Sequence, residues 1–206
     1  MNDTPKKNNT NPKENKNSGF SPIILPQSPA AGSPQKNLTG PPRIAKDIVA
    51  NLYNNIQHWN DDHIKGAQIV KQIAVLKSND PKNYSLPLEA YINDLYNVFQ
   101  SLINHVKCFE TLIAQIAALA KLQKKTEPLF VSLDAISIAN LVETVANAYR
   151  EEIKIKNVVL ENIAHSKNRD EAMFFAACWT FQTHITSIIN LKLEALLVEM
   201  GHRNLT

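Results

Sequence analysis

The chain has 206 residues, a net charge of +3 and five glycines. Its hydrophobic content of 44% is near the average of globular proteins, which excludes a chain that is disordered throughout. The few glycines argue against a βαβ nucleotide-binding enzyme and favour helices. Residues 1–43 carry six basic and two acidic side chains, a charge of +4, so the remainder carries −1. The body therefore shows no general footprint for nucleic acid.

Membrane and secretion signals are absent from the sequence pattern. The N-terminus has no apolar signal segment, and no stretch reaches the roughly 18 uninterrupted apolar residues of a membrane span. Cys108 and Cys178 lie within apolar helical patterns, so free, buried cysteines are the simplest interpretation. We expect a soluble intracellular protein.

Residues 1–42 form a tail rich in Asn, Lys, Pro and Ser. Its apolar surface is limited to Phe20 and the run Ile23-Ile24-Leu25, too little to offset the entropy of ordering the segment. We predict that the tail is disordered. The Ile23-Ile24-Leu25 run is either a short docking peptide or, more simply, a chance cluster.

Four Ser/Thr-Pro pairs make the tail a candidate for proline-directed phosphorylation, with acceptors Thr4, Ser21, Ser28 and Ser33. Thr4 and Ser33 also have a lysine three residues later. The residue before proline prefers an extended backbone, and each phosphate would add nearly two negative charges. Chance occurrence in a proline-rich linker is the alternative.

The first predicted helix begins just after Pro42 and runs to about Leu76. Its apolar residues follow the 3–4 spacing of a coiled-coil seam: Val49, Leu52, Ile56, Trp59, Val70 and Ile73. His63 and Gly66 interrupt the seam, and glycine costs a helix about 1 kcal/mol relative to alanine. We expect a bend, a thin crossing point or a partner's side chain there.

The second predicted helix, from about Leu88 to Lys125, has an unbroken seam. Its members are Ile92, Leu95, Phe99, Leu102, Val106, Phe109, Ile113, Ile116 and Ala120. A seam of this length, on the order of 50 Å, has to meet another helix and favours elongated packing. It is longer than a small compact domain needs, which suggests surface left over for a partner.

Two further helices are predicted, the third after a loop that contains Pro128 and the fourth after a short turn at residues 168–170. The third has Asp134 as its N-cap and ends near His165, and the fourth runs from about Asp170 to Met200. Gly201 is then the residue after the helix end, and His202 and Arg203 favour the negative end of the helix dipole. The sequence thus predicts an all-α domain, residues 43–206, of four long amphipathic helices. They form an elongated antiparallel bundle or paired coiled-coil hairpins.

No catalytic, cofactor-binding or metal-binding motif is recognisable. Phosphate loops, nucleophile elbows and zinc-protease helices are absent, and His58 and His63 are five residues apart, a poor spacing for shared ligation. Glu151 and Glu152 lie beside basic residues, which predicts solvated ion pairs such as Glu152 with Lys156. We therefore expect a protein that is not an enzyme.

Trp59 and Trp179 are candidate partner contacts, because tryptophan is enriched at interfaces. Both also lie on the apolar stripe of a helix, so core packing is the favoured alternative.

The run Leu193 to Arg203 ends in Gly201-His202-Arg203 and resembles the end of the cyclin-dependent kinase 2-interacting protein family. Further similar segments occur in the same order: Arg43 to Asp47, Trp59, Ile73 to Lys77, Pro128 to Phe130, Tyr149-Arg150 with Glu152, Ala164-His165 and Trp179. The resemblance spans about residues 42–203. Residues 131–136 depart from the more aromatic, proline-containing stretch of the family.

This resemblance implies a nuclear, non-enzymatic adaptor without cofactors that forms hetero-oligomers. The partners it implies are cyclin-dependent and replication-initiation kinases, checkpoint proteins and a complex containing AAA+ ATPases. The processes are large ribosomal subunit maturation, DNA replication and checkpoint signalling.

Two alternatives remain. A structural coiled coil that forms homo-oligomers would use the same heptads. An enzyme built on a helical bundle, with Glu-x-x-His metal ligands on facing helices, is the least favoured.

Overall fold

The computed structural model describes residues 38–80, 82, 84–123 and 127–203. Thr4, Ser21, Ser28, Ser33 and the run Ile23-Ile24-Leu25 lie outside these residues, so their phosphorylation and docking remain predictions. The described residues fold into helices without a strand, as the all-α prediction requires.

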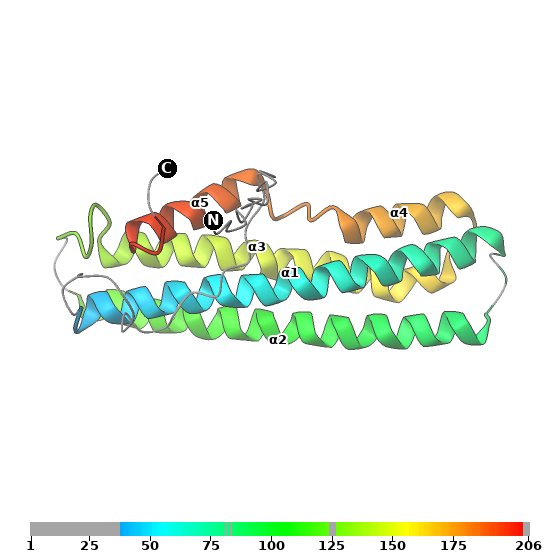
Figure 1. Ribbon diagram of the computed structural model, residues 1–206, viewed down its shortest axis with the longest axis horizontal. Coiled ribbons are helices and arrows are strands. Elements are labelled where there is room, and N and C mark those ends of the chain that lie inside the picture. Colours follow the sequence, from blue (N-terminus) through cyan, green and yellow to red (C-terminus); the bar gives the residue numbers. More distant parts are fainter. Residues whose placement is uncertain (1–37, 81, 83, 124–126, 204–206) are drawn as a thin grey trace, which may run out of the picture.

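In the described part of the chain, three long helices and two shorter ones make up the fold (Figure 1). They are α1 (Pro41–Asn79), α2 (Leu86–Leu122), α3 (Ala135–Asn162), α4 (Arg169–Thr180) and α5 (Ser187–Glu199), with a 3-10 turn, η1 (Ile163–His165), after α3. The molecule is elongated, and successive long helices run in opposite directions. Helix α2 packs on α1 and α3, whereas α4 contacts mainly α1, and α5 contacts mainly α3.

Local sequence signals set several helix ends. Pro41 starts α1, following Gly40, whose φ of 68° is accessible to glycine without strain. The Asp134 carboxylate accepts a hydrogen bond from the Ser137 N–H at 2.7 Å, which confirms it as the N-cap of α3. Asn168 caps α4 in the same way.

The seam of α2 is buried between α1 and α3, so it is not the open surface that its length suggested. The predicted residues from Leu95 to Phe109 and Ile116 are buried, whereas Ile92, Ile113 and Ala120 are half-buried, and Leu112 and Leu119 are buried in place of the last two. A helix with 3.6 residues per turn drifts away from a 3.5-residue repeat, so the buried face moves by one position.

The predicted fourth helix is in fact two helices, α4 and α5, separated by a break at residues 181–186. Side chains from α1 and α3 bind this break. The Trp59 Nε1–H donates to Gln182 Oε1 at 2.9 Å, and the His184 N–H donates to Glu152 Oε2 at 3.1 Å. The Lys156 ammonium donates to the Trp179 carbonyl. These bonds satisfy polar groups that a continuous helix would not present.

The prediction that Glu152 and Lys156 form a solvated pair is therefore wrong. Both side chains are fully buried, and Lys156 Nζ lies 3.0 Å from Glu152 Oε1. The break lies over α3 and supplies the further hydrogen-bond partners that a buried pair requires.

The interruption at Gly66 is a thin crossing point, one of the outcomes expected there. The indole of Trp179 lies directly against the Gly66 backbone, and its Nε1–H donates to the His63 carbonyl at 3.3 Å. A Cβ at Gly66 would come within 2.7 Å of Trp179 Nε1, which leaves room only for glycine.

The structure also bears on the expected burial of the cysteines and on the expected absence of a membrane span. Both cysteines are free, but Cys108 is exposed and Cys178 half-buried, so the expected burial is wrong for Cys108, which α2 turns away from its neighbours. Within the described ranges, no helix is long and apolar enough to cross a membrane.

Candidate partner-binding surface

The two tryptophans are core residues. Trp59 and Trp179 have no exposed surface, and Trp59 packs edge-to-face on Tyr149 with ring centroids 5.2 Å apart. The alternative of core packing is correct for both, and neither offers side-chain surface to a partner in this structure.

The Gly201-His202-Arg203 ending fastens α5 to α1. Gly201 has a φ of 67°, as predicted for the residue after a helix end. The Arg203 guanidinium donates to Glu194 Oε2 at 2.9 Å and to the Tyr53 hydroxyl at 2.8 Å. Because Tyr53 belongs to α1, this contact joins the end of the chain to its first helix.

His202 also contacts α1. Its Nε2 lies 3.2 Å from the Lys46 carbonyl in α1, and burial lowers the pKa of the imidazole below its usual value. The lowered pKa favours the neutral form of the ring, whereas an interaction with the helix dipole requires the charged form, so that contribution stays a prediction. The ring holds this segment against α1 by its hydrogen bond and its partial burial.

Helix α5 is apolar on two faces. Leu193, Leu196 and Leu197 are buried against the rest of the protein. The opposite face carries Ile188, Leu191, Ala195 and Val198 at the 3–4–3 spacing of a helix stripe, and we call these four residues the α5 surface. Ile188 is 63% exposed and Leu191 is 69% exposed. Adjacent exposed apolar side chains of this kind mark interaction sites.

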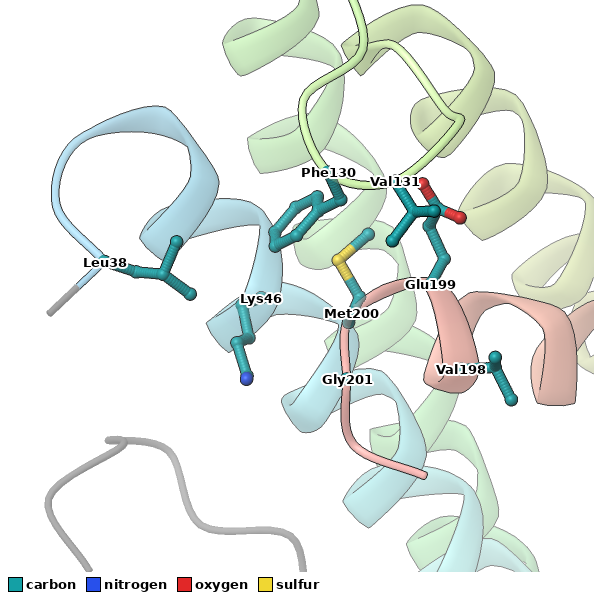
Figure 2. Close-up of a pocket in the computed structure, with 8 residues that line it drawn as sticks. All are labelled: Leu38, Lys46, Phe130, Val131, Val198, Glu199, Met200 and Gly201. Carbon is teal, nitrogen blue, oxygen red and sulfur yellow. The ribbon is translucent and has the colours of Figure 1, made fainter. Parts of the chain in front are cut away.

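A hollow of about 360 Å³ lies at the end of the α5 surface (Figure 2). It is formed by three segments that are far apart in sequence and is lined by Leu38, Lys46, Phe130, Val131, Val198, Glu199, Met200 and Gly201. Phe130 and Met200 lie side by side, and Leu38 faces them from the start of the described chain. Met200 is buried, whereas Val131 is 82% exposed. The hollow is thus an apolar recess with an open rim.

Glu199 holds the loop that forms this rim. Its carboxylate accepts hydrogen bonds from the Ser132 N–H at 2.6 Å, the Leu133 N–H at 2.8 Å and the Ser132 hydroxyl at 2.9 Å. Partial burial raises the pKa of Glu199, but these bonds outweigh it and bring the pKa below its usual value. The negative charge of Glu199 is therefore balanced by hydrogen bonds from the loop.

A second apolar groove, of about 550 Å³, lies between α1 and α4. Ile64, Met173 and Phe181 line it, and each has more than half of its surface exposed. This groove lies on a different pair of helices from the α5 surface.

Chemistry-bearing side chains do not gather around either feature. Among the residues that the structure describes, no group of three or more His, Cys, Asp or Glu side chains could hold a metal ion. Glu199 and His202 have Glu-x-x-His spacing, but the carboxylate binds the loop and the imidazole binds the Lys46 carbonyl. What the site offers is apolar surface with fixed geometry.

Neither the α5 surface nor the hollow was predicted from the sequence. The signal that was available is the composition of Ser187–Glu199, in which apolar residues lie all around the helix instead of on one side.

Comparison with known proteins gives a consistent set of relatives, although no family model matches the chain. Three of them, each named cyclin-dependent kinase 2-interacting protein, come from Bos taurus, Mus musculus and Xenopus laevis. The Bos taurus protein is 25% identical over 78% of this chain and 90% of its own length. The corresponding values are 24%, 79% and 91% for Mus musculus and 22%, 92% and 99% for Xenopus laevis. The resemblance predicted from the sequence is thereby confirmed.

Proposed function

We propose that this protein is a non-enzymatic adaptor that binds partner proteins through the α5 surface. The observation that carries the proposal is the stripe of exposed Ile188, Leu191 and Ala195, continued by the half-buried Val198, on a helix whose other face is already buried. The names of the relatives support an interaction role, since each describes a protein that interacts with a kinase.

An apolar helix of the partner suits the α5 surface. Side chains at 3–4–3 spacing form the ridge on which a second helix packs, as in a coiled coil. The ridge extends for most of the length of α5, so it accepts about three turns of a partner helix. The exposed aliphatic groups would supply the buried centre of that interface.

The more specific roles rest on the similarity to the relatives. They are a nuclear location, binding to a cyclin-dependent or replication-initiation kinase, and membership of a complex that contains AAA+ ATPases. The complex would act in large ribosomal subunit maturation and in DNA replication and checkpoint signalling. These roles require a hetero-oligomer, for which the α5 surface provides an attachment point.

Affinity purification from nuclear extract tests the proposal. The tagged full-length chain is compared with Ile188→Lys/Leu191→Lys and with Val158→Lys. Val158 is an apolar residue of α3, 49% exposed, and serves as the matched control. Quantitative mass spectrometry should recover AAA+ ATPases or a kinase at near-equal stoichiometry with the wild type and the control. The double variant should lose them at least tenfold, because a partner helix would have to bury two ammonium groups.

Circular dichroism checks that the double variant remains folded, which is expected because both positions are exposed. Equal recovery of the same partners with all three proteins would contradict the α5 surface as the binding site. Recovery of only the tagged chain itself would contradict the adaptor function.

A further inference from the structure

The described chain begins on the wall of the hollow. Leu38 lines the recess opposite Phe130 and Met200, two residues before the turn at Gly40 (Figure 2). The φ of 68° and ψ of −147° at Gly40 form a backbone conformation that other residues rarely adopt. This turn places Leu38 against the hollow instead of in line with α1. Leu38, to which residues 1–37 are joined, therefore lies beside the recess.

The segment before Leu38 contains one run of large aliphatic residues, Ile23-Ile24-Leu25, bounded by Pro22 and Pro26. Proline favours an extended backbone in the residue before it and removes its own N–H donor. An extended run of this type presents its aliphatic side chains without requiring regular secondary structure. The same chain therefore holds an apolar peptide and an apolar recess.

The distance along the chain permits the two to meet. Residues 26–37 separate Leu25 from Leu38 and span at most about 40 Å when extended. A loop of this length costs little more to close than a shorter one. Covalent connection also gives the run an effective concentration near the hollow in the millimolar range. A peptide of modest intrinsic affinity would thus be bound most of the time.

We propose that Ile23, Ile24 and Leu25 dock in cis in the hollow and cover Phe130, Met200 and Val131. Aliphatic side chains match the apolar wall. The Glu199 carboxylate is bonded to the loop, which leaves Lys46 as the other charged residue of the lining. A segment of the same chain is favoured over a second molecule because its linker begins on the wall of the recess. The argument for docking does not use partner binding at the α5 surface, although Val198 belongs to both features.

Methyl NMR of the full-length protein tests the docking. The chain has three methionines, of which Met200 lines the hollow and Met173 lines the α1–α4 groove. The variant Ile23→Ser/Ile24→Ser/Leu25→Ser should shift the Met200 methyl resonance and leave that of Met173 in place. The control Asn8→Ser/Asn9→Ser/Asn11→Ser, with three polar changes in the same tail, should shift neither.

Adding a synthetic peptide of residues 18–30 to the triple Ser variant gives the converse experiment. It should move the Met200 resonance back towards its wild-type position in a saturable way. An unchanged Met200 resonance in the triple Ser variant overturns the proposal, and so does a peptide that moves only Met173. An unchanged Met173 resonance confirms that the fold is retained.

Discussion

Gly66 illustrates how one missing side chain positions two helices. The Trp179 indole lies on the α1 backbone at this residue and donates to the His63 carbonyl. Glycine weakens α1 locally, but it lets a fully buried tryptophan from α4 reach the axis of α1. The close packing gained there offsets the cost of the glycine.

Gly66→Ala should lower the free energy of unfolding by about 1–3 kcal/mol. The added methyl group would overlap the indole, and this overpacking outweighs the ~1 kcal/mol that alanine contributes to helix stability. Urea denaturation followed by circular dichroism measures the change. Gln68→Ala, at an exposed position two residues later, should change stability by less than about 0.5 kcal/mol. A neutral or stabilised Gly66→Ala would mean that Trp179 moves aside at little cost.

His63 makes stability depend on pH. Burial, followed by the nearby charge of Lys156, lowers the pKa of His63 to about 4. The Nδ1 atom has no hydrogen-bond partner in the described part of the chain. The folded protein therefore keeps this imidazole neutral at a pH at which the unfolded chain protonates it.

The unfolded state binds this proton below a pH of about 6.5, and the folded state binds it only near 4. Stability should consequently fall as pH decreases through this window, by roughly 3 kcal/mol for a shift of this size. Thermal or urea unfolding between pH 7.5 and 4 measures the slope. In His63→Gln the slope should be shallower than in the wild type, whereas His58→Gln serves as the control. Parallel pH profiles for the wild type and His63→Gln would contradict a buried neutral His63.

The α4–α5 break shows which elements local sequence determines and which it leaves open. Proline and capping residues act on their own helix, so the ends near Pro41 and Asp134 could be predicted. The break depends on Trp59, Glu152 and Lys156, which lie on other helices. A local pattern contains no information on such partners, and the apolar periodicity therefore predicted one helix through residues 181–186.

The candidate site also combines features that local sequence determines with features that depend on contacts between helices. The positive φ at Gly201 was predicted because a helix end sets it locally. The hollow combines the start of α1, the loop before α3 and the end of α5, so predicting it would have required knowledge of how the helices pack. Helix α5 is less buried than its composition indicates. Its apolar residues indicate a buried helix, yet it lies at the outside of the fold with one face open.

At the scale of the whole molecule, exposed apolar surface lies on α5 and in the α1–α4 groove instead of on the longest seam. Helices α1 and α3 cover the α2 seam, so a long seam is by itself no evidence for a partner. The α5 surface spans about three turns and four residues. A stable homodimer buries about 800 Å² on each subunit, contributed by 20–30 residues. The α5 surface alone is too small for that and better suits one contact within a larger assembly.

The isolated protein should therefore be a monomer of 23.1 kDa at micromolar concentration, as measured by light scattering coupled to size exclusion. Self-association through α5 alone would bury less surface than a stable dimer requires. The entropy lost on association would therefore exceed the free energy gained by burying that surface. Ile188→Lys/Leu191→Lys should leave the mass unchanged. A wild-type dimer that becomes monomeric in this variant would instead establish α5 as a self-association helix and favour the homo-oligomeric coiled coil. A dimer that persists in the variant would assign self-association to another surface, such as the α1–α4 groove.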